Sequence, residues 1–171
     1  MFPARAALFV AALAGASTLA VSATAAPSDP HADSKFLVNN AHAKGVHVLP
    51  GLQYKILKSG PATGAHPTRK DDVKVRYEGR LVDGKVFDSS YKDGDGTVTF
   101  QLGRLIPGWI IGVQLMRPGD EWEFYIPAEM AYGEKGAGNG VIPPNATLIF
   151  KLELVSATPH VEPAAAAADK K

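Results

Sequence analysis

The chain has 171 residues, of which 46% are hydrophobic and 20% are charged, as expected for one ordinary globular domain with short extensions. Its 18 basic and 17 acidic residues nearly cancel, so the charge pattern indicates neither a nucleic-acid-binding surface nor an acidic tail. Because the sequence contains no cysteine, it excludes disulfide bonds, thiolate catalysis and cysteine-based zinc sites.

The first 25 residues have the pattern of a cleavable secretory signal. A positive charge at Arg5 precedes a run of small apolar residues, and Ala23-Thr24-Ala25 supplies the small-x-small motif that signal peptidase reads. A retained membrane anchor is the alternative, but the apolar run is shorter than the ~20 residues that span a bilayer. We therefore expect residues 1–25 to be removed after Ala25, and the protein to be periplasmic or secreted.

A linker and a short helical segment are expected over residues 26–48. Ser34 is a candidate N-cap and Gly45 a candidate stop for a weak helix between them. The apolar face of this helix is thin, so the helix alone would be only marginally stable.

From Gly51 onward, apolar residues recur with a period of two, which predicts half-buried β-strands. Asp83-Gly84, between two such runs, predicts a hairpin with a type I′ turn. The strands are expected over residues 52–57, 73–82, 85–87, 97–102, 121–126 and 147–154.

One segment, residues 108–116, has helical periodicity instead. Trp109, Val113 and Met116 share a face at spacing i, i+4 and i+7, and Pro107 precedes them. The other residues leave almost no polar face, so we expect the helix to be buried. The sequence therefore predicts an α+β domain in which an antiparallel sheet wraps around one short apolar helix. Residues 158–171 are expected to form a disordered tail.

The usual catalytic motifs are mostly absent from the sequence. It contains no G-x-S-x-G, Walker A or G-x-G-x-x-G motif, and its five histidines form no close metal-ligand pair. We therefore expect no metal and no cofactor. Aromatic residues are frequent instead, and Trp109 begins a helix directly after a Pro-Gly turn, which places it to form the floor of an apolar ligand pocket. Filling of the core is the alternative role for these rings.

Several short blocks occur in a characteristic order: VKVRYEG at 73–79, DGKVFDSS at 83–90, LIPGW at 105–109, AYG at 131–133 and VIPPNATLIF at 141–150. Together they closely resemble the FKBP-type peptidyl-prolyl cis-trans isomerases. The match runs from about Leu49 to Val155, and the preceding residues are similar to secreted bacterial members such as the macrophage infectivity potentiator group, with a shortened N-terminal region. The resemblance implies a domain over residues 49–157, with a half-barrel sheet of about five strands.

The resemblance also implies the activity. Such an isomerase accelerates rotation about X–Pro bonds in exported proteins and assists their folding. Its partners would be proline-containing polypeptides and macrolide inhibitors, and not nucleic acid. The protein would not insert stably into a membrane once the signal is cleaved, and it would be a monomer or a weak dimer. A chaperone or peptide-binding module on this scaffold is the alternative function, and a carbohydrate-binding β domain is a more distant one.

Site residues follow from the same resemblance. Tyr77, Asp88 and Tyr132 would be catalytic: Tyr132 would donate a hydrogen bond to a substrate carbonyl, and Asp88 would either lie near the twisting carbonyl or only orient Tyr77. The residues that would line or rim the substrate pocket are Phe87, Val98, Phe100, Leu105, Ile106, Trp109, Val141, Ile142 and Phe150, with Trp109 under the proline ring. Val98 stands where eukaryotic members often have phenylalanine, and the 134–140 loop is slightly longer, so substrate preference is expected to depend on these positions.

Overall fold

The computed structural model describes residues 30–92 and 94–161. The predicted signal peptide and most of the predicted tail lie outside these residues. The helices and strands, in chain order, are α1 (Pro30–Asn40), β1 (Val46–Leu49), β2 (Leu52–Lys58), β3 (Asp71–Leu81), β4 (Val86–Ser89), β5 (Val98–Gln101), α2 (Pro107–Val113), β6 (Glu121–Ile126) and β7 (Leu148–Pro159). Short 3₁₀ turns lie at Ser90–Lys92, Leu102–Arg104, Ala128–Met130 and Gly133–Lys135.

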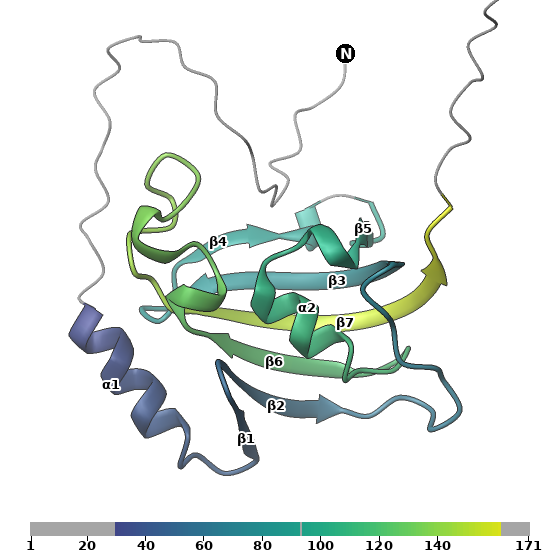
Figure 1. Cartoon of the computed structure of the whole chain (residues 1–171), viewed down its shortest axis with the longest axis horizontal. Coiled ribbons are helices and arrows are strands. Elements are labelled where there is room, and N and C mark those ends of the chain that lie inside the picture. Colours follow the sequence, from purple (N-terminus) through teal and green to yellow (C-terminus); the bar gives the residue numbers. More distant parts are fainter. Residues whose placement is uncertain (1–29, 93, 162–171) are drawn as a thin grey trace, which may run out of the picture.

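The strands of the described residues form one antiparallel, seven-stranded sheet. Its order is β1-β2-β6-β7-β3-β4, and β5 pairs with β3 as well. Figure 1 shows this curved sheet with α2 lying across one face. The predicted α+β class is therefore confirmed. The number of about five strands that the resemblance implied is too low: the runs at 85–87 and 97–102 are β4 and β5, and β1 lies in the segment predicted to be a linker.

The N-terminal helix differs from its prediction at both ends. α1 begins at Pro30, not Ser34, and ends at Asn40, not Lys44. Proline suits the first turn of a helix because its missing N–H needs no partner there. After Asn40 the chain turns, with the Ala43 amide donating to the Asn40 carbonyl at 2.9 Å, and Gly45 at φ 81° leads into β1.

The hairpin between β3 and β4 is confirmed, but its predicted type I′ turn is wrong. A type I′ turn needs positive φ at both central residues, whereas Gly84 has φ 87° and Asp83 is not among the positive-φ residues. The Gly84 amide donates to the Leu81 carbonyl, and the Leu81 amide to the Lys85 carbonyl, both at 2.9 Å. Pairing at Leu81 and Lys85 leaves three residues in the loop, and a left-handed glycine closes such loops after an ordinary turn.

The C-terminal strand is longer than predicted. β7 continues to Pro159, past the predicted domain end at residue 157, and pairs there with Asp71 at the start of β3. Nδ1 of His160 lies 2.8 Å from a carboxylate oxygen of Asp72. Residues 158 and 159 thus belong to the sheet and not to a disordered tail, because β3 begins at Asp71 and provides backbone partners for them, and His160 is held by its side-chain contact to Asp72.

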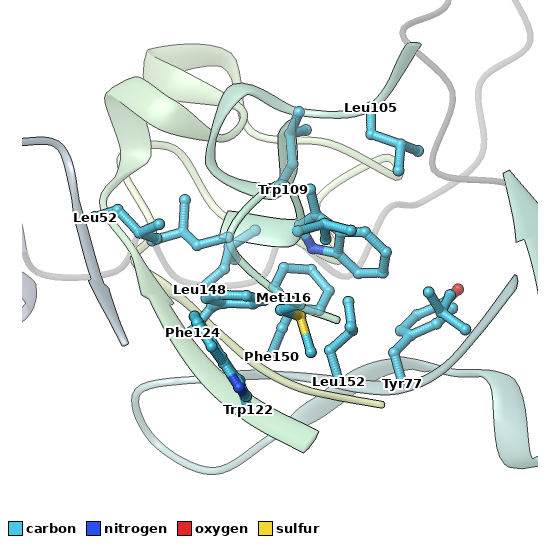
Figure 2. Packing of buried hydrophobic residues seen from close by; sticks show 14 of the residues in the cluster. Leu52, Tyr77, Leu105, Trp109, Met116, Trp122, Phe124, Leu148, Phe150 and Leu152 are labelled. Carbon is cyan, nitrogen blue, oxygen red and sulfur yellow. The ribbon is translucent and has the colours of Figure 1, made fainter. Parts of the chain in front are cut away.

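The core lies between α2 and the sheet, and two glycines set their separation. A methyl group on Gly108 would lie 2.5 Å from Cγ2 of Ile126, and one on Gly112 would lie 2.5 Å from Cε1 of Phe124. The helix backbone therefore rests directly on β6. Trp109, Val113 and Met116 are buried as predicted, and Figure 2 shows Trp109 and Met116 among the core side chains. Leu115 is 39% exposed because α2 ends at Val113.

We expect Gly112→Ala to lower the free energy of unfolding by about 1–3 kcal/mol, because the new methyl group must displace the Phe124 ring or lift α2 from the sheet. Chemical denaturation measures this change. Helix propensity alone predicts the opposite sign, a gain of about 1 kcal/mol. A variant that is as stable as the parent, or more stable, would therefore show that α2 has room at this position.

Candidate active site

Five aromatic side chains from five elements meet where α2 packs on the sheet. We call them the aromatic cluster: Tyr77 of β3, Phe87 of β4, Phe100 of β5, Trp109 of α2 and Phe150 of β7. Trp109 is central, because its ring lies 5.3 Å from those of Tyr77 and Phe150 and 6.2 Å from that of Phe100, nearly perpendicular to each. Phe87 meets Phe150 edge-to-face at 5.5 Å. These are favourable aromatic geometries, so the cluster forms a defined apolar surface.

Local structure explains how these rings converge. α2 begins directly after Ile106, whose backbone is extended. The Trp109 amide donates to the Ile106 carbonyl at 3.0 Å, so Trp109 lies in the first turn of the helix. On β3, alternation turns Tyr77 and Gly79 toward the core. The absence of a side chain at Gly79 provides the space for two rings: a methyl group there would lie 2.6 Å from Cζ of Phe87 and 2.7 Å from Cε1 of Phe150.

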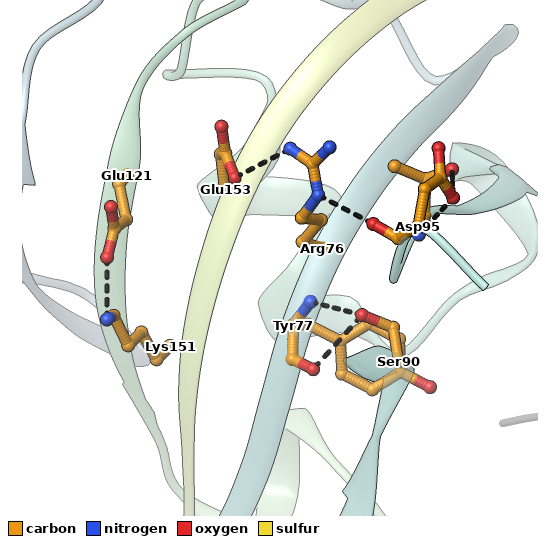
Figure 3. A network of polar contacts seen from close by, with 8 residues as sticks. Arg76, Tyr77, Ser90, Asp95, Glu121, Lys151 and Glu153 are labelled. Carbon is orange, nitrogen blue, oxygen red and sulfur yellow. Dashed lines mark hydrogen bonds and ion pairs between the residues drawn. The ribbon is translucent and has the colours of Figure 1, made fainter. Parts of the chain in front are cut away.

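Tyr77 is held through its hydroxyl and its backbone. Its hydroxyl donates to Oδ2 of Asp88 at 2.7 Å, and Oδ1 of the same carboxylate accepts the Ser89 amide at 2.9 Å. The Ser90 hydroxyl accepts the Tyr77 amide at 2.9 Å and donates to the Tyr77 carbonyl at 3.3 Å, as Figure 3 shows. Burial, and then the bond to Asp88, raise the pKa of Tyr77 well above its ordinary value.

Tyr132 begins a glycine-rich loop, residues 132–145, which we call the site loop. The loop is closed by hydrogen bonds in both directions between Ala137 and Ile142, each 3.0 Å, and by the Asn145 amide donating to the Gly133 carbonyl at 2.9 Å. Its glycines and Asn139 adopt positive φ, which permits these tight reversals. Tyr132 is half-buried; burial and then the Asp88 charge raise its pKa to about 12.

The remaining predicted residues surround the cluster unequally. Leu105, Ile106 and Ile142 are buried in the same hydrophobic core as Trp109. Val98 is half-buried on β5, and Val141 is 44% exposed. The indole N–H of Trp109 has no hydrogen-bond partner within the described part of the chain. The centre of the site is thus lined mainly by apolar side chains, and its polar groups are this indole N–H, the hydroxyls of Tyr77 and Tyr132 and the carboxylate of Asp88.

Sequence reasoning did not identify two residues that shape this site. Ser90 holds the backbone of Tyr77, and Gly79 makes room for the rings of Phe87 and Phe150. A signal for Gly79 was present, because glycine inside a strand pattern indicates a close approach. Among the described residues no group of three or more His, Asp or Glu side chains could hold a metal ion, and no helix is long and apolar enough to cross a membrane.

Known proteins resemble this chain in sequence and in structure. Residues 63–155 match the family model described as FKBP-type peptidyl-prolyl cis-trans isomerase. A probable FKBP-type peptidyl-prolyl cis-trans isomerase FkpA of Neisseria meningitidis is 55% identical over 121 residues, which are 70% of this chain and 43% of that protein. The outer membrane protein MIP of Legionella longbeachae is 51% identical over 122 residues, 71% of this chain and 51% of that protein.

Among solved structures, a peptidyl-prolyl cis-trans isomerase of Pseudomonas syringae pv. tomato superposes with a TM-score of 0.67 at 35% identity, covering 75% of this chain and 92% of that one. The chain spans about half the length of the curated relatives it matches. The residues that match the family model, 63–155, include every residue of the aromatic cluster.

Proposed function

The chain belongs to the FKBP-type peptidyl-prolyl cis-trans isomerase family, and on this premise we propose that it accelerates rotation about X–Pro bonds in proline-containing polypeptides. The observation that carries the proposal is the aromatic cluster around Trp109, with the Tyr77–Asp88 hydrogen bond at its edge. An apolar aromatic surface with a few placed polar groups suits a proline ring and its flanking amides.

The chemistry needs only selective stabilisation of a twisted amide. Rotation about an X–Pro bond crosses a barrier of about 18–20 kcal/mol, at which amide resonance is lost. The twisted carbonyl is less polar than the planar one, so an apolar site favours it over the well-solvated ground state. A thousandfold acceleration corresponds to about 4 kcal/mol. Since no covalent bond breaks, shape, desolvation and one or two hydrogen bonds suffice.

In this proposal Trp109 lies under the proline ring, and the rest of the aromatic cluster forms the walls with Ile142. Tyr132 donates a hydrogen bond to a substrate carbonyl. The Tyr77–Asp88 bond supports an orienting role for Asp88. The alternative role for its carboxylate is to act near the twisting carbonyl. The rim consists of Val98, Leu105, Ile106 and Val141, and we propose that substrate preference depends on Val98 and the tip of the site loop.

The activity is tested by following cis-to-trans exchange of a proline-containing peptide, in a protease-coupled assay or by NMR. We expect catalysis that a macrolide such as rapamycin inhibits. A rate equal to the uncatalysed background would rule the proposal out. Suppression of the aggregation of a proline-free client, without isomerase activity, would instead favour a chaperone module.

The tyrosine pKa values predict how activity depends on pH. A tyrosine hydroxyl ordinarily titrates near 10, and the pKa of Tyr132 in the folded protein is about 12. The folded state holds the Tyr132 proton more tightly than the unfolded state does. The protonated hydroxyl therefore contributes fully to folding stability below pH ~10, and this contribution is lost as pH rises through about 12. We expect kcat/KM to stay level up to pH ~10. A fall centred well below this pH that Tyr132→Phe abolishes would contradict the assignment of Tyr132 as a protonated donor.

We also propose that the protein is exported and acts on exported clients, with residues 1–25 as its signal. The signal pattern of the sequence supports this, as does a relative named an outer membrane protein. N-terminal sequencing of the protein from a fractionated bacterial host is expected to read from Ala26, in the periplasmic fraction. Recovery from the cytoplasm with an intact N-terminus would contradict export.

A further inference from the structure

α1 lies on the sheet face opposite α2. Gln53 of β2 is the register partner of Tyr125 on β6, so both side chains share one face. The neighbouring Phe124 faces α2, and alternation therefore turns Tyr125 away from it. Phe36 of α1 packs on Tyr125 with ring centroids 6.0 Å apart.

Gln53 binds α1 through both ends of its amide group. Its Oε1 accepts Nδ2 of Asn40 at 2.9 Å, and its Nε2 donates to the Leu37 carbonyl at 2.9 Å. An isolated helix as short as α1 is marginal in water, so these contacts stabilise it on the domain.

The first turn of α1 contacts the short connection between the site loop and β7. Asp33 is only 7% exposed, and its Oδ2 accepts the amide N–H of Thr147, 114 residues away, at 2.6 Å. Thr147 is 2% exposed and lies between the site loop and β7. A hydrogen bond from a backbone amide to a buried carboxylate is strong, and its loss would leave a buried N–H without that partner.

This junction is linked to both ends of the proposed site. Upstream of Thr147, the Asn145 amide bonds to the carbonyl of Gly133, next to Tyr132, and the Ile142 backbone bonds to Ala137. Downstream, Phe150 of the aromatic cluster follows on β7. The position of Thr147 therefore determines where the site loop returns to the sheet.

We propose that Asp33 is a positioning residue for the isomerase site, which holds the site loop through the Thr147 amide. This inference rests on the proposed function. In this proposal α1 contributes to the geometry of the isomerase site, although it precedes the family-matched residues 63–155. Without the Asp33 bond, the site loop must be ordered during substrate binding, so KM should rise more than kcat falls.

The experiment compares Asp33→Ala and Asp33→Asn with Asp120→Ala as a matched control. Asp120 is also 7% exposed, and its carboxylate accepts backbone amides of Gly60 at 2.6 Å and Arg117 at 2.7 Å. It precedes β6 at the end of the sheet where Glu121 pairs with Glu153, whereas Thr147 precedes Leu148 at the other end. Loss of Asp120 therefore tests general destabilisation without touching the site loop.

We expect Asp33→Ala to lower kcat/KM about tenfold, mainly through KM, at a temperature where every variant is folded. Asp33→Asn, which keeps an oxygen acceptor, should recover part of the loss, and Asp120→Ala should stay within about twofold of the parent. In NMR spectra, Asp33→Ala should shift the Thr147 amide proton and speed hydrogen exchange in residues 133–145, and Asp120→Ala should do neither.

Parental kinetics in Asp33→Ala, or an equal loss in Asp120→Ala, would overturn the positioning role. If Asp33→Ala does not fold, Asp33→Asn decides, because it removes the charge that strengthens the bond: a shifted Thr147 amide resonance together with a parental KM would overturn it. Absence of isomerase activity in the parent would refute the proposed function. The Thr147 shift and the loop exchange would then still show whether Asp33 holds the loop.

Discussion

Replacing Trp109 by phenylalanine should lower kcat/KM for a proline-containing peptide about tenfold, whereas the same change at Trp122 should leave it within about twofold. Trp109 contacts three rings of the aromatic cluster at 5.3 to 6.2 Å. Trp122 is a matched control, because it is 6% exposed and its indole N–H also lacks a partner in the described chain. Its ring packs on Tyr54 and Phe124, outside the cluster.

The two variants are compared at equal folded fraction, with their stability measured by denaturant titration. Truncation to alanine at either tryptophan should cost about 3–5 kcal/mol of unfolding free energy, so phenylalanine is the informative replacement. Macrolide affinity gives a second measurement, which Trp109→Phe and Phe87→Ala should both weaken. Equal effects at Trp109 and Trp122 would show that the aromatic cluster is core and not site.

The second large effect is expected for Gly79→Ala. The new methyl group would lie 2.6 Å from Phe87 and 2.7 Å from Phe150, so one of these rings must move. We expect a loss of about 1–3 kcal/mol in unfolding free energy, together with at least a tenfold loss of kcat/KM, because the same rings form the proposed site. Circular dichroism in the near ultraviolet should report the displaced aromatic side chains.

Gly84→Ala provides the control for stability. Gly84 has φ 87° and no atoms within 4 Å of an added methyl group, so its replacement strains only the hairpin backbone. It should cost about 1 kcal/mol without changing kcat/KM. If Gly79→Ala retained parental activity at full folding, the rings of Phe87 and Phe150 would not be part of the site.

Local sequence pattern predicted the elements that carry their own signal. The alternation of Glu121–Ile126 marked β6 at both ends, and Pro107 marked the start of α2. β1 was not predicted, because its four residues are too few for a period of two to be distinguished from a linker. Its pairing with β2 supplies the stability that its length does not.

The same limit applies at helix and strand ends. Ser34 has the chemistry of an N-cap, yet α1 begins earlier, at Pro30, and the Asp33 side chain in its first turn contacts Thr147. β7 was expected to end at residue 154, but β3 offers backbone partners up to Pro159. The ends of helices and strands depend on which segments pair or pack with them, and a local window of sequence does not contain those segments.

The sequence by itself determined the α+β class, the succession of strands around one apolar helix, and the residue blocks that resemble the family. These properties depend on periodicity and on residue types close together in the chain. Only the tertiary structure decided that Gly79 leaves room for two rings, that Ser90 holds Tyr77, and that Asp33 reaches Thr147. Each of these is a contact between distant residues, whose distance is set by how the packed layers meet and not by any nearby pattern.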